Sequence, residues 1–237
     1  MTLLWNAVAL VAAYLIGSLS FAVIVSRFMG LSDPRSYGSG NPGATNVLRS
    51  GNKKAAALTL LFDLVKGLVP VALVVLWGHH LGLDETSAAW VGLAAFLGHL
   101  WPVFFRFQGG KGVATAAGVL LGLNPLLGGV VLLTWLMVAY FTRYSSLAAL
   151  IAAAAAPVIH LVGWGGSGAT VALLIMSGLL IWRHQANISK LLAGTESRIG
   201  QKTGSTPPSD AGAAPAATQP AAKRPHHSRH HPKRKSH

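Results

Sequence analysis

Long apolar runs constrain the fold of this chain more than any other feature of its sequence. They occupy residues 3–26, 55–77, 88–107, 113–123, 126–141, 147–162 and 169–182. A helix of about 20 apolar residues crosses the roughly 30 Å hydrocarbon core of a bilayer. With 52% hydrophobic and 11% charged residues, and a mean hydropathy of +0.50, the chain has too little polar surface to cover a soluble core. We therefore predict an all-α integral membrane protein, a bundle of seven transmembrane helices.

Two of these runs need separate comment. Residues 113–123 are too few to cross the bilayer as a straight helix at about 1.5 Å per residue, so we expect a short or re-entrant helix there. The first run is not preceded by a basic segment and has no small-residue cleavage site. We therefore predict that it is the first membrane helix and not a removed signal.

Basic residues set the expected orientation, because Lys and Arg gather in alternate connections between the runs. Such connections usually stay on the cytoplasmic side of a membrane. We therefore predict that the N-terminus is outside, that the C-terminus is cytoplasmic, and that the basic connections share one face. They contain Arg27, Arg35, Arg49, Lys53 and Lys54, then Arg106 and Lys111, then Arg143, and finally Arg183 and Lys190.

The last part of the chain has a different composition. Residues 204–237 are rich in Pro, Ala, Ser, His, Lys and Arg and lack large apolar side chains, which is typical of disorder. We predict a membrane domain at residues 1–203 and a disordered basic cytoplasmic tail at 204–237. Much of the net charge of +13 lies in this tail, so the charge does not predict nucleic-acid binding. The tail is either simply solvated or held electrostatically at anionic lipid headgroups.

The first of three polar clusters is GSGNPGATNVLRSG, residues 38–51. Glycines such as Gly40 let backbone N–H groups face an anion without interference from a Cβ atom. Asn-Pro-Gly by itself is common in turns. A turn does not require so many side-chain donors, however, and we predict an anion-binding loop. The donors are Ser39, Asn41, Thr45, Asn46 and Arg49.

The second cluster, residues 98–115, contains Gly-Gly-Lys-Gly directly before the predicted helix at 113–123. A helix N-terminus carries unpaired N–H groups and a partial positive charge, and a neighbouring lysine strengthens it as an anion site. A Walker A loop is excluded, because Phe105 stands where glycine is needed and Gly112 follows the lysine. We predict a phosphate site without a nucleotide, formed by Lys111 and the substrate-binding residues Gly109, Gly110, Gly112 and Thr115.

The third cluster is RHQANISKLLAGTESRIG, residues 183–200, which we expect to leave the membrane as a short amphipathic helix. His184 and Asn187 are three residues apart and can share one helix face. Inside the second apolar run, Asp63 and Lys66 have the same spacing. Charged groups are costly in hydrocarbon, so we predict that they pair and face the bundle interior. This pair either orients Arg49 or Lys111 or only fixes helix packing.

The residue types in the three clusters restrict the chemistry. The only acids near them are Asp33 and Glu196, so catalysis by two carboxylates and oxygen-rich metal binding are both disfavoured. The chain has no cysteine, which excludes disulfides and a thiolate nucleophile. We predict no metal and no cofactor. The many donors and cations favour binding of two phosphorylated substrates and stabilisation of charge on a leaving phosphate.

Three runs in this order, SGNPGATN, Gly98-His99 to GGKGVAT, and RHQANI with a later Gly194-x-Glu196, resemble the bacterial acyl-phosphate:glycerol-3-phosphate acyltransferases. The resemblance extends from the first run to about residue 200. It implies a seven-helix enzyme of phospholipid synthesis in the bacterial cell membrane, and the distribution of basic residues predicts that its active site faces the cytoplasm. The implied substrates are acyl phosphate and glycerol 3-phosphate, and the products lysophosphatidic acid and phosphate. The implied site residues are Ser39, Asn41, Thr45, Arg49, Lys111, His184 and Asn187.

An acyl phosphate is a mixed anhydride, so the hydroxyl of the acceptor can attack it directly. Two groups are candidates to take the hydroxyl proton. His184 is the only conventional base in the clusters. The resemblance instead implies that a substrate phosphate oxygen accepts the proton, and we favour this reading, with His184 as a donor beside Arg183.

Other functions fit the sequence less well. A transporter for an organic phosphate would place its polar breaks near the middle of the membrane, whereas these clusters lie at the ends of the runs. A scaffold does not need so many polar residues at lipid boundaries. His79 and Asp84 have the His-x4-Asp spacing of a different group of glycerolipid acyltransferases. They lie in a connection predicted to be external, away from the three clusters.

Overall fold

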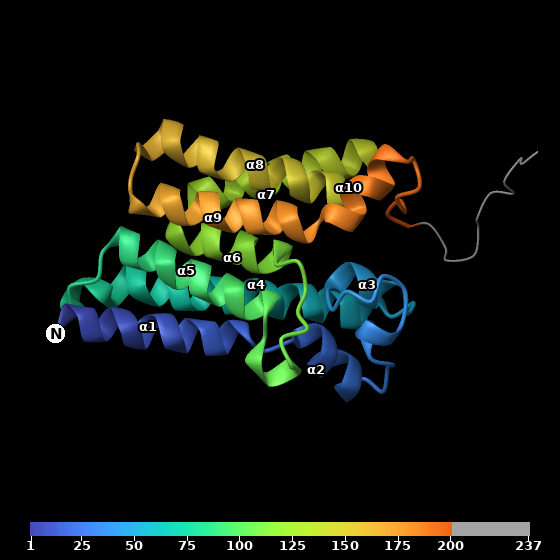
Figure 1. Ribbon diagram of the computed structural model, residues 1–237, viewed down its shortest axis with the longest axis horizontal. Coiled ribbons are helices and arrows are strands. Elements are labelled where there is room, and N and C mark those ends of the chain that lie inside the picture. Colours follow the sequence, from blue (N-terminus) through green and yellow to red (C-terminus); the bar gives the residue numbers. More distant parts are fainter. Residues whose placement is uncertain (201–237) are drawn as a thin grey trace, which may run out of the picture. The chain divides into compact units, whose positions relative to one another are not determined.

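The computed structural model describes residues 1–200, so the predicted basic tail at 204–237 lies outside the described residues. The helices of the described part run side by side as a bundle (Figure 1). They are α1 (Thr2–Gly17), α2 (Phe21–Phe28), α3 (Ala44–Leu48), α4 (Lys53–Trp77), α5 (Glu85–Leu100), α6 (Val113–Leu123), α7 (Pro125–Thr142), α8 (Ser145–Trp164), α9 (Gly168–Arg183) and α10 (Gln185–Leu192), with 3-10 turns η1 (Pro34–Ser36), η2 (Gly78–Leu81) and η3 (Val103–Phe105).

The predicted first helix is instead two helices. The run 3–26 is divided into α1 and α2, which are bent by 42° relative to each other. At the break, the N–H of Val23 bonds to the carbonyl of Ser20 at 3.0 Å, which leaves the carbonyl of Leu19 without its helical partner. Lys66 of α4 donates to that carbonyl at 2.7 Å. The break is therefore held by a side chain that is remote in the sequence.

The other runs correspond closely to single helices, and the run 113–123 is α6. The predicted helix at 88–107 ends earlier, at Leu100. Pro102 explains the early end, because a proline has no N–H to donate and disfavours helical geometry in the residue before it. Trp101 has φ −131° and ψ 71°, outside the helical region.

Four segments of the described chain are long and apolar enough to cross a membrane, and the count rises to six if α1–α2 and α9–α10 are each one bent span. The four are Lys53–Leu81, Glu85–Phe105, Pro125–Thr142 and Ser145–Trp164. α6 is too short to qualify, as we expected of the fourth run. An integral membrane protein is therefore supported, while the count of seven and the orientation of the termini stay predictions.

Close helix contacts in the bundle depend on glycine. A Cβ on Gly118 of α6 would collide with a carbonyl oxygen of α4, and one on Gly67 of α4 would collide with the carbonyl of Thr115. Gly17 and Gly98 bring α1 and α5 together in the same way. Small residues at such contacts are typical of membrane helices. The N-terminus of α6, which follows the Gly-Gly-Lys-Gly loop, is thereby fixed against α4.

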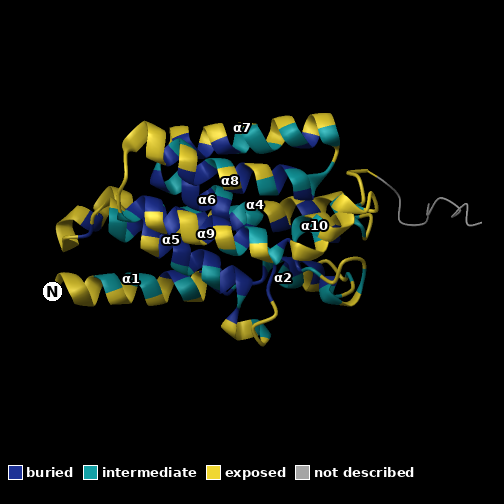
Figure 2. Cartoon of the chain, turned by 45° about the horizontal axis from the view of Figure 1, so that its top comes forward, coloured by how far each residue is buried: buried dark blue, intermediate teal, exposed yellow. Residues whose placement is uncertain are grey.

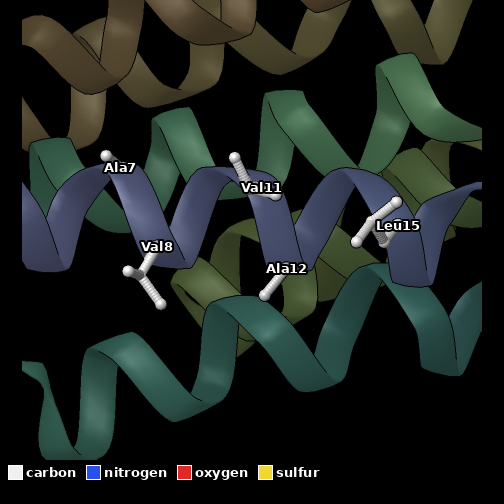
Figure 3. A pocket seen from close by; sticks show the side chains of 5 residues that line it. All are labelled: Ala7, Val8, Val11, Ala12 and Leu15. Atoms are coloured by element: carbon white, nitrogen blue, oxygen red, sulfur yellow. The ribbon is translucent and has the colours of Figure 1, made fainter.

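The outer surface of the bundle is apolar, as expected for helices in contact with lipid. α7 shows a largely exposed surface in Figure 2 and carries exposed Leu133, Leu136, Met137, Tyr140 and Phe141. Figure 3 shows a shallow hollow on the outside of α1, lined only by aliphatic side chains. These are Ala7, Val8, Val11, Ala12 and Leu15. With no polar group, this hollow suits lipid chains and not an anionic substrate.

Candidate active site

The three polar clusters lie at one end of the bundle. In Figure 1, α3, the connection between α5 and α6, and α10 are at the end opposite η2 and the α8–α9 connection. Arg49 of the first cluster donates to the Ser197 hydroxyl of the third at 2.8 Å. Lys111 of the second cluster donates to the amide oxygen of Asn187 of the third. The prediction that the clusters share one face is therefore confirmed.

The first cluster folds around Asn46, whose side chain is 1% exposed. Its amide oxygen accepts from the N–H of Ser39 at 3.0 Å and from the Arg49 guanidinium at 3.3 Å. Its amide nitrogen donates to the carbonyls of Pro34 at 2.6 Å and Tyr37 at 3.1 Å. We predicted that Asn46 contacts substrate. In the structure its hydrogen-bonding groups are used inside the loop, so its role here is to hold the loop's shape.

Ser39, Asn41 and Thr45 of this loop are at least partly open to solvent. Gly38 and Gly40 have φ of 60° and 67°, in the left-handed region that glycine adopts without strain. The backbone between them turns so that Ser39 and Gly40 are exposed, as is Thr45 in α3, while Asn41 is half-buried. These predicted site residues therefore stay accessible to a ligand.

The Gly-Gly-Lys-Gly loop needs its glycines for space. A Cβ on Gly109 would collide with the His99 carbonyl, and one on Gly110 with the His99 ring. The N–H of Gly110 donates to the His99 carbonyl at 3.2 Å. Gly112 has φ 83° and directly precedes α6, whose first turn receives no side-chain cap from the described residues. Its N–H groups are therefore available to an anion beside Lys111.

Arg183, at the end of α9, holds this loop from the other side. Its guanidinium donates to the carbonyl of Gly110 at 3.1 Å and to that of Gly109 at 2.9 Å. We did not include Arg183 among the site residues. The only sequence signal was its position directly before His184, and its partners lie 73 and 74 residues away.

Lys111 belongs to a chain of polar contacts that joins α8 and α10. Asn187, which accepts from Lys111, donates to the Glu196 carboxylate at 2.7 Å, and Ser146 donates to the same oxygen at 2.7 Å. We did not predict Glu196 or Ser146 as site residues. The sequence marked Glu196 only as one of two acids near the clusters and as part of Gly194-x-Glu196. Ser146 gave no signal, because only the fold brings the start of α8 to this place.

The electrostatics of Lys111 suit an anion. Burial is the main cause that lowers its pKa from 10.5 to about 8. Glu196 opposes this change in pKa, while the nearby cations Lys190, Arg183 and Arg49 add to it. In the free site, burial and the neighbouring positive charges therefore destabilise the charged form of Lys111. A bound phosphate would stabilise the ammonium by supplying a negative charge beside it.

His184 lies at the 58° bend between α9 and α10 and is 2% exposed. Its Nδ1 is 2.8 Å from the carbonyl oxygen of Leu180. A carbonyl only accepts, so Nδ1 carries a proton and Nε2 is the nitrogen that remains for substrate. In the neutral ring Nε2 is an acceptor, and in the protonated ring it is a donor. The geometry is compatible with either predicted role of His184.

Asp63 and Lys66 form an ion pair of 2.7 Å, and both are 3% exposed. The prediction that they pair and face the interior is confirmed. Beyond Lys66, Asp63 lies 3.6 Å from the ring of His99. The sequence left open whether the pair orients Arg49 or Lys111 or only fixes helix packing, and this contact alone does not decide between the two. The Thr115 hydroxyl lies 3.3 Å from that ring and is 0% exposed. The hydroxyl of Thr115 is therefore buried in this network, whereas we predicted it at the substrate.

His79 and Asp84 are at the opposite end of the bundle. His79 is in η2, and Asp84 caps α5 by accepting from the N–H of Ser87 at 2.8 Å. Within residues 1–200, no three His, Cys, Asp or Glu side chains are placed so as to hold a metal ion.

The family model for glycerol-3-phosphate acyltransferase matches residues 7–194, a stretch that includes the first two clusters and residues 183–194 of the third. The chain belongs to this family. It is 64% identical over 211 residues to a glycerol-3-phosphate acyltransferase of Paraburkholderia phytofirmans, covering 89% of this chain and 97% of the relative. A relative from Paraburkholderia xenovorans is 62% identical over 212 residues, covering 90% of this chain and 97% of that one.

The fold is also similar to a solved member of the family. The crystal structure of PlsY, an integral membrane glycerol 3-phosphate acyltransferase, in its glycerol 3-phosphate form superposes with a TM-score of 0.77 at 38% identity. This match covers 82% of the present chain and 96% of PlsY. The present chain is therefore an acyltransferase and an integral membrane protein.

Proposed function

We propose that this acyltransferase moves the acyl group of acyl phosphate to the sn-1 hydroxyl of glycerol 3-phosphate. The products are lysophosphatidic acid and inorganic phosphate, in the first acylation step of phospholipid synthesis. The observation that carries the proposal is the position of Lys111, in a glycine loop at the start of α6 and in contact with Asn187. The relatives' names support the acceptor, since one PlsY structure is described as its glycerol 3-phosphate form.

In this reaction the hydroxyl oxygen attacks the carbonyl carbon of the acyl phosphate. The new ester bond forms, the bond from that carbon to the phosphate oxygen breaks, and its electron pair leaves with phosphate. Lys111 and the N–H groups at the start of α6 would stabilise the charge that develops on this phosphate. Arg49 and Arg183 add positive charge near Lys111, which reduces the repulsion between two anionic substrates.

The hydroxyl proton must go to an acceptor as the new bond forms. We assign it to a phosphate oxygen of the substrate, and we assign to Nε2 of His184 the role of a hydrogen-bonding group that orients the substrates. The alternative assigns the proton to the same Nε2 atom, which is the ring nitrogen not bonded to Leu180. No covalent enzyme intermediate is needed in either case, since the donor is already activated.

We further propose that the site faces the cytoplasm of a bacterial cell and that the N-terminus is outside. The basis is the concentration of Lys and Arg in the connections at the site's end of the bundle. Counting α1–α2 and α9–α10 as one passage each, and α6 as a short passage beside α4, gives seven passages.

A purified preparation incubated with palmitoyl phosphate and glycerol 3-phosphate tests the reaction. Lysophosphatidic acid and phosphate should appear in equal amounts, and palmitoyl-CoA should not replace the donor. Products from palmitoyl-CoA alone would contradict the assignment of the donor. Flux of labelled glycerol 3-phosphate into liposomes, without product formation, would favour a transporter instead.

A further inference from the structure

A buried chain of polar contacts connects the break between α1 and α2 with the first turn of α6. Lys66 donates to the Leu19 carbonyl at 2.7 Å and pairs with Asp63 at 2.7 Å. Asp63 lies 3.6 Å from Nδ1 of His99, and the same Nδ1 lies 3.3 Å from the Thr115 hydroxyl. Four polar side chains thus join three helices, α4, α5 and α6, to the break between α1 and α2.

Burial of such a network between helices costs desolvation free energy that apolar packing does not. Buried charges lose their hydration, and apolar residues of similar volume often pack as well or better. The Asp63 oxygen that faces Lys66 and His99 makes no aligned hydrogen bond with any of residues 1–200, so it acts mainly as a fixed negative charge. Packing alone does not account for a charge placed there.

His99, a member of this network, supports the phosphate loop. Its carbonyl accepts from the N–H of Gly110 at 3.2 Å, and its ring fills the space where a Cβ on Gly110 would lie. Arg183 holds the carbonyls of the same loop at 2.9 and 3.1 Å. Gly110 directly precedes Lys111, so the orientation of the His99 ring sets the backbone from which Lys111 projects.

We propose that Asp63 is a positioning residue for acyl transfer, which fixes the His99 ring against Gly110 and thereby holds Lys111 at the anion site. This inference rests on the proposed function. Asp63 acts through His99 and does not need to touch either substrate. Displacement of a catalytic group by about 1 Å can cost on the order of a hundredfold in rate. Loss of Asp63 should therefore lower kcat and leave the KM for glycerol 3-phosphate nearly unchanged.

The test removes both charges together, because removal of one would leave an unpaired buried ion. The double variant Asp63→Asn/Lys66→Met should still extract from membranes in folded form, with a lowered unfolding temperature because the bond from Lys66 to the Leu19 carbonyl is lost as well. Its kcat should fall on the order of a hundredfold, with the KM for glycerol 3-phosphate within about twofold. The matched control is Thr59→Val, one turn earlier in α4. Thr59 is 0% exposed and its hydroxyl has no hydrogen-bond partner in the described part of the chain, so this variant should keep the wild-type kcat.

A double-mutant cycle with His99→Gln separates positioning from a general structural effect. If Asp63 acts through His99, adding His99→Gln to the double variant should lower kcat by no more than about threefold beyond the larger single effect. If the losses in kcat of the two variants multiply in the combined variant, the two sites act independently and the proposal is overturned. A wild-type kcat in the folded double variant would overturn it too. If Asp63→Asn/Lys66→Met does not fold, Asp63→Glu, which keeps the charge but moves it, takes its place in the same cycle.

Affinity for inorganic phosphate gives a readout that does not depend on turnover. Titration calorimetry should show a Kd raised about tenfold in the double variant and unchanged in Thr59→Val, since a displaced Lys111 loses a charge-assisted contact. An unchanged Kd in the double variant would overturn the positioning role. If the wild type binds phosphate but forms no lysophosphatidic acid, the proposed reaction fails, while the phosphate titration still decides the role of Asp63.

Discussion

The ammonium of Lys111 donates a hydrogen bond to the side-chain oxygen of Asn187, 76 residues further along the chain. This contact joins the glycine loop before α6 to the helix that follows the last long apolar segment. Asn187 is itself held by Glu196 at 2.7 Å. The lysine is therefore fixed in place before substrate arrives, which lowers the cost of organising the site during the reaction.

Replacement of Lys111 by alanine should nearly abolish acyl transfer. Removing one charge-assisted contact to a transferring group typically costs about 3 kcal/mol, or a hundredfold or more in kcat. Lys111→Arg should recover little, because a planar guanidinium does not replace a compact ammonium in a tight glycine-lined loop. Turnover is measured as phosphate release, beside thermal unfolding in detergent. Near-wild-type turnover in a folded Lys111→Ala protein would contradict the phosphate-site assignment.

The pH dependence of kcat/KM should show an alkaline limb near 8. The pKa of Lys111 in the free protein is about 8, so its ammonium is complete well below that pH and is lost as pH rises through it. Glu196 raises this pKa, and Glu196→Gln should therefore move the limb to lower pH. A limb that stays in place in Glu196→Gln, with the protein folded, would mean that another group titrates.

Replacement of Arg183 by lysine should lower kcat even though the positive charge is kept. Arg183→Lys retains a cation but cannot donate to the carbonyls of Gly109 and Gly110 from one planar group, as the guanidinium does. We expect kcat to fall about tenfold or more, since each lost hydrogen bond to a charged donor is worth about 1.5–3 kcal/mol. Arg27→Lys in α2 is the matched control and should keep wild-type turnover. Equal activities of the two variants would contradict the proposal that Arg183 holds the carbonyls of Gly109 and Gly110.

Membrane topology can be checked independently of activity. A reporter fused after Gly200 should be active in the cytoplasm, and one inserted at Asp84 should be active outside. The reason is the collection of basic residues at the end of the bundle that carries the site. An external signal after Gly200 would reverse the proposed orientation and place the site on the wrong side for a cytoplasmic acyl phosphate.

Much of the fold was predictable from the sequence, because the hydrocarbon thickness imposes a length on apolar runs. α4, α6, α7, α8 and α9 follow the predicted runs closely. The break between α1 and α2 was not predictable, since it depends on the contact between Lys66 and the Leu19 carbonyl, 47 residues apart. Local sequence carries no sign of a partner at that distance.

The candidate site, like the fold, was only partly predictable from the sequence. Glycine-rich runs with several donors identified the loops, and charge placement correctly put them at one end. The sequence did not separate residues that face a ligand from residues that hold the loop. Thr115 carries a hydroxyl like the exposed Ser39, and Asn46 carries an amide like the half-buried Asn41, yet Thr115 and Asn46 are 0% and 1% exposed. Only tertiary packing shows which polar groups are already paired.

His184→Ala distinguishes the two acceptors of the hydroxyl proton. Nδ1 of His184 is bonded to the Leu180 carbonyl, so any proton transfer must use Nε2. If Nε2 were the base, the variant would lose the acid limb of kcat against pH, and added imidazole would restore part of the rate. We expect instead a slower enzyme that keeps the shape of its pH profile and does not respond to imidazole, because the substrate phosphate titrates in both proteins. Rescue by imidazole that rises with pH would assign the proton to His184.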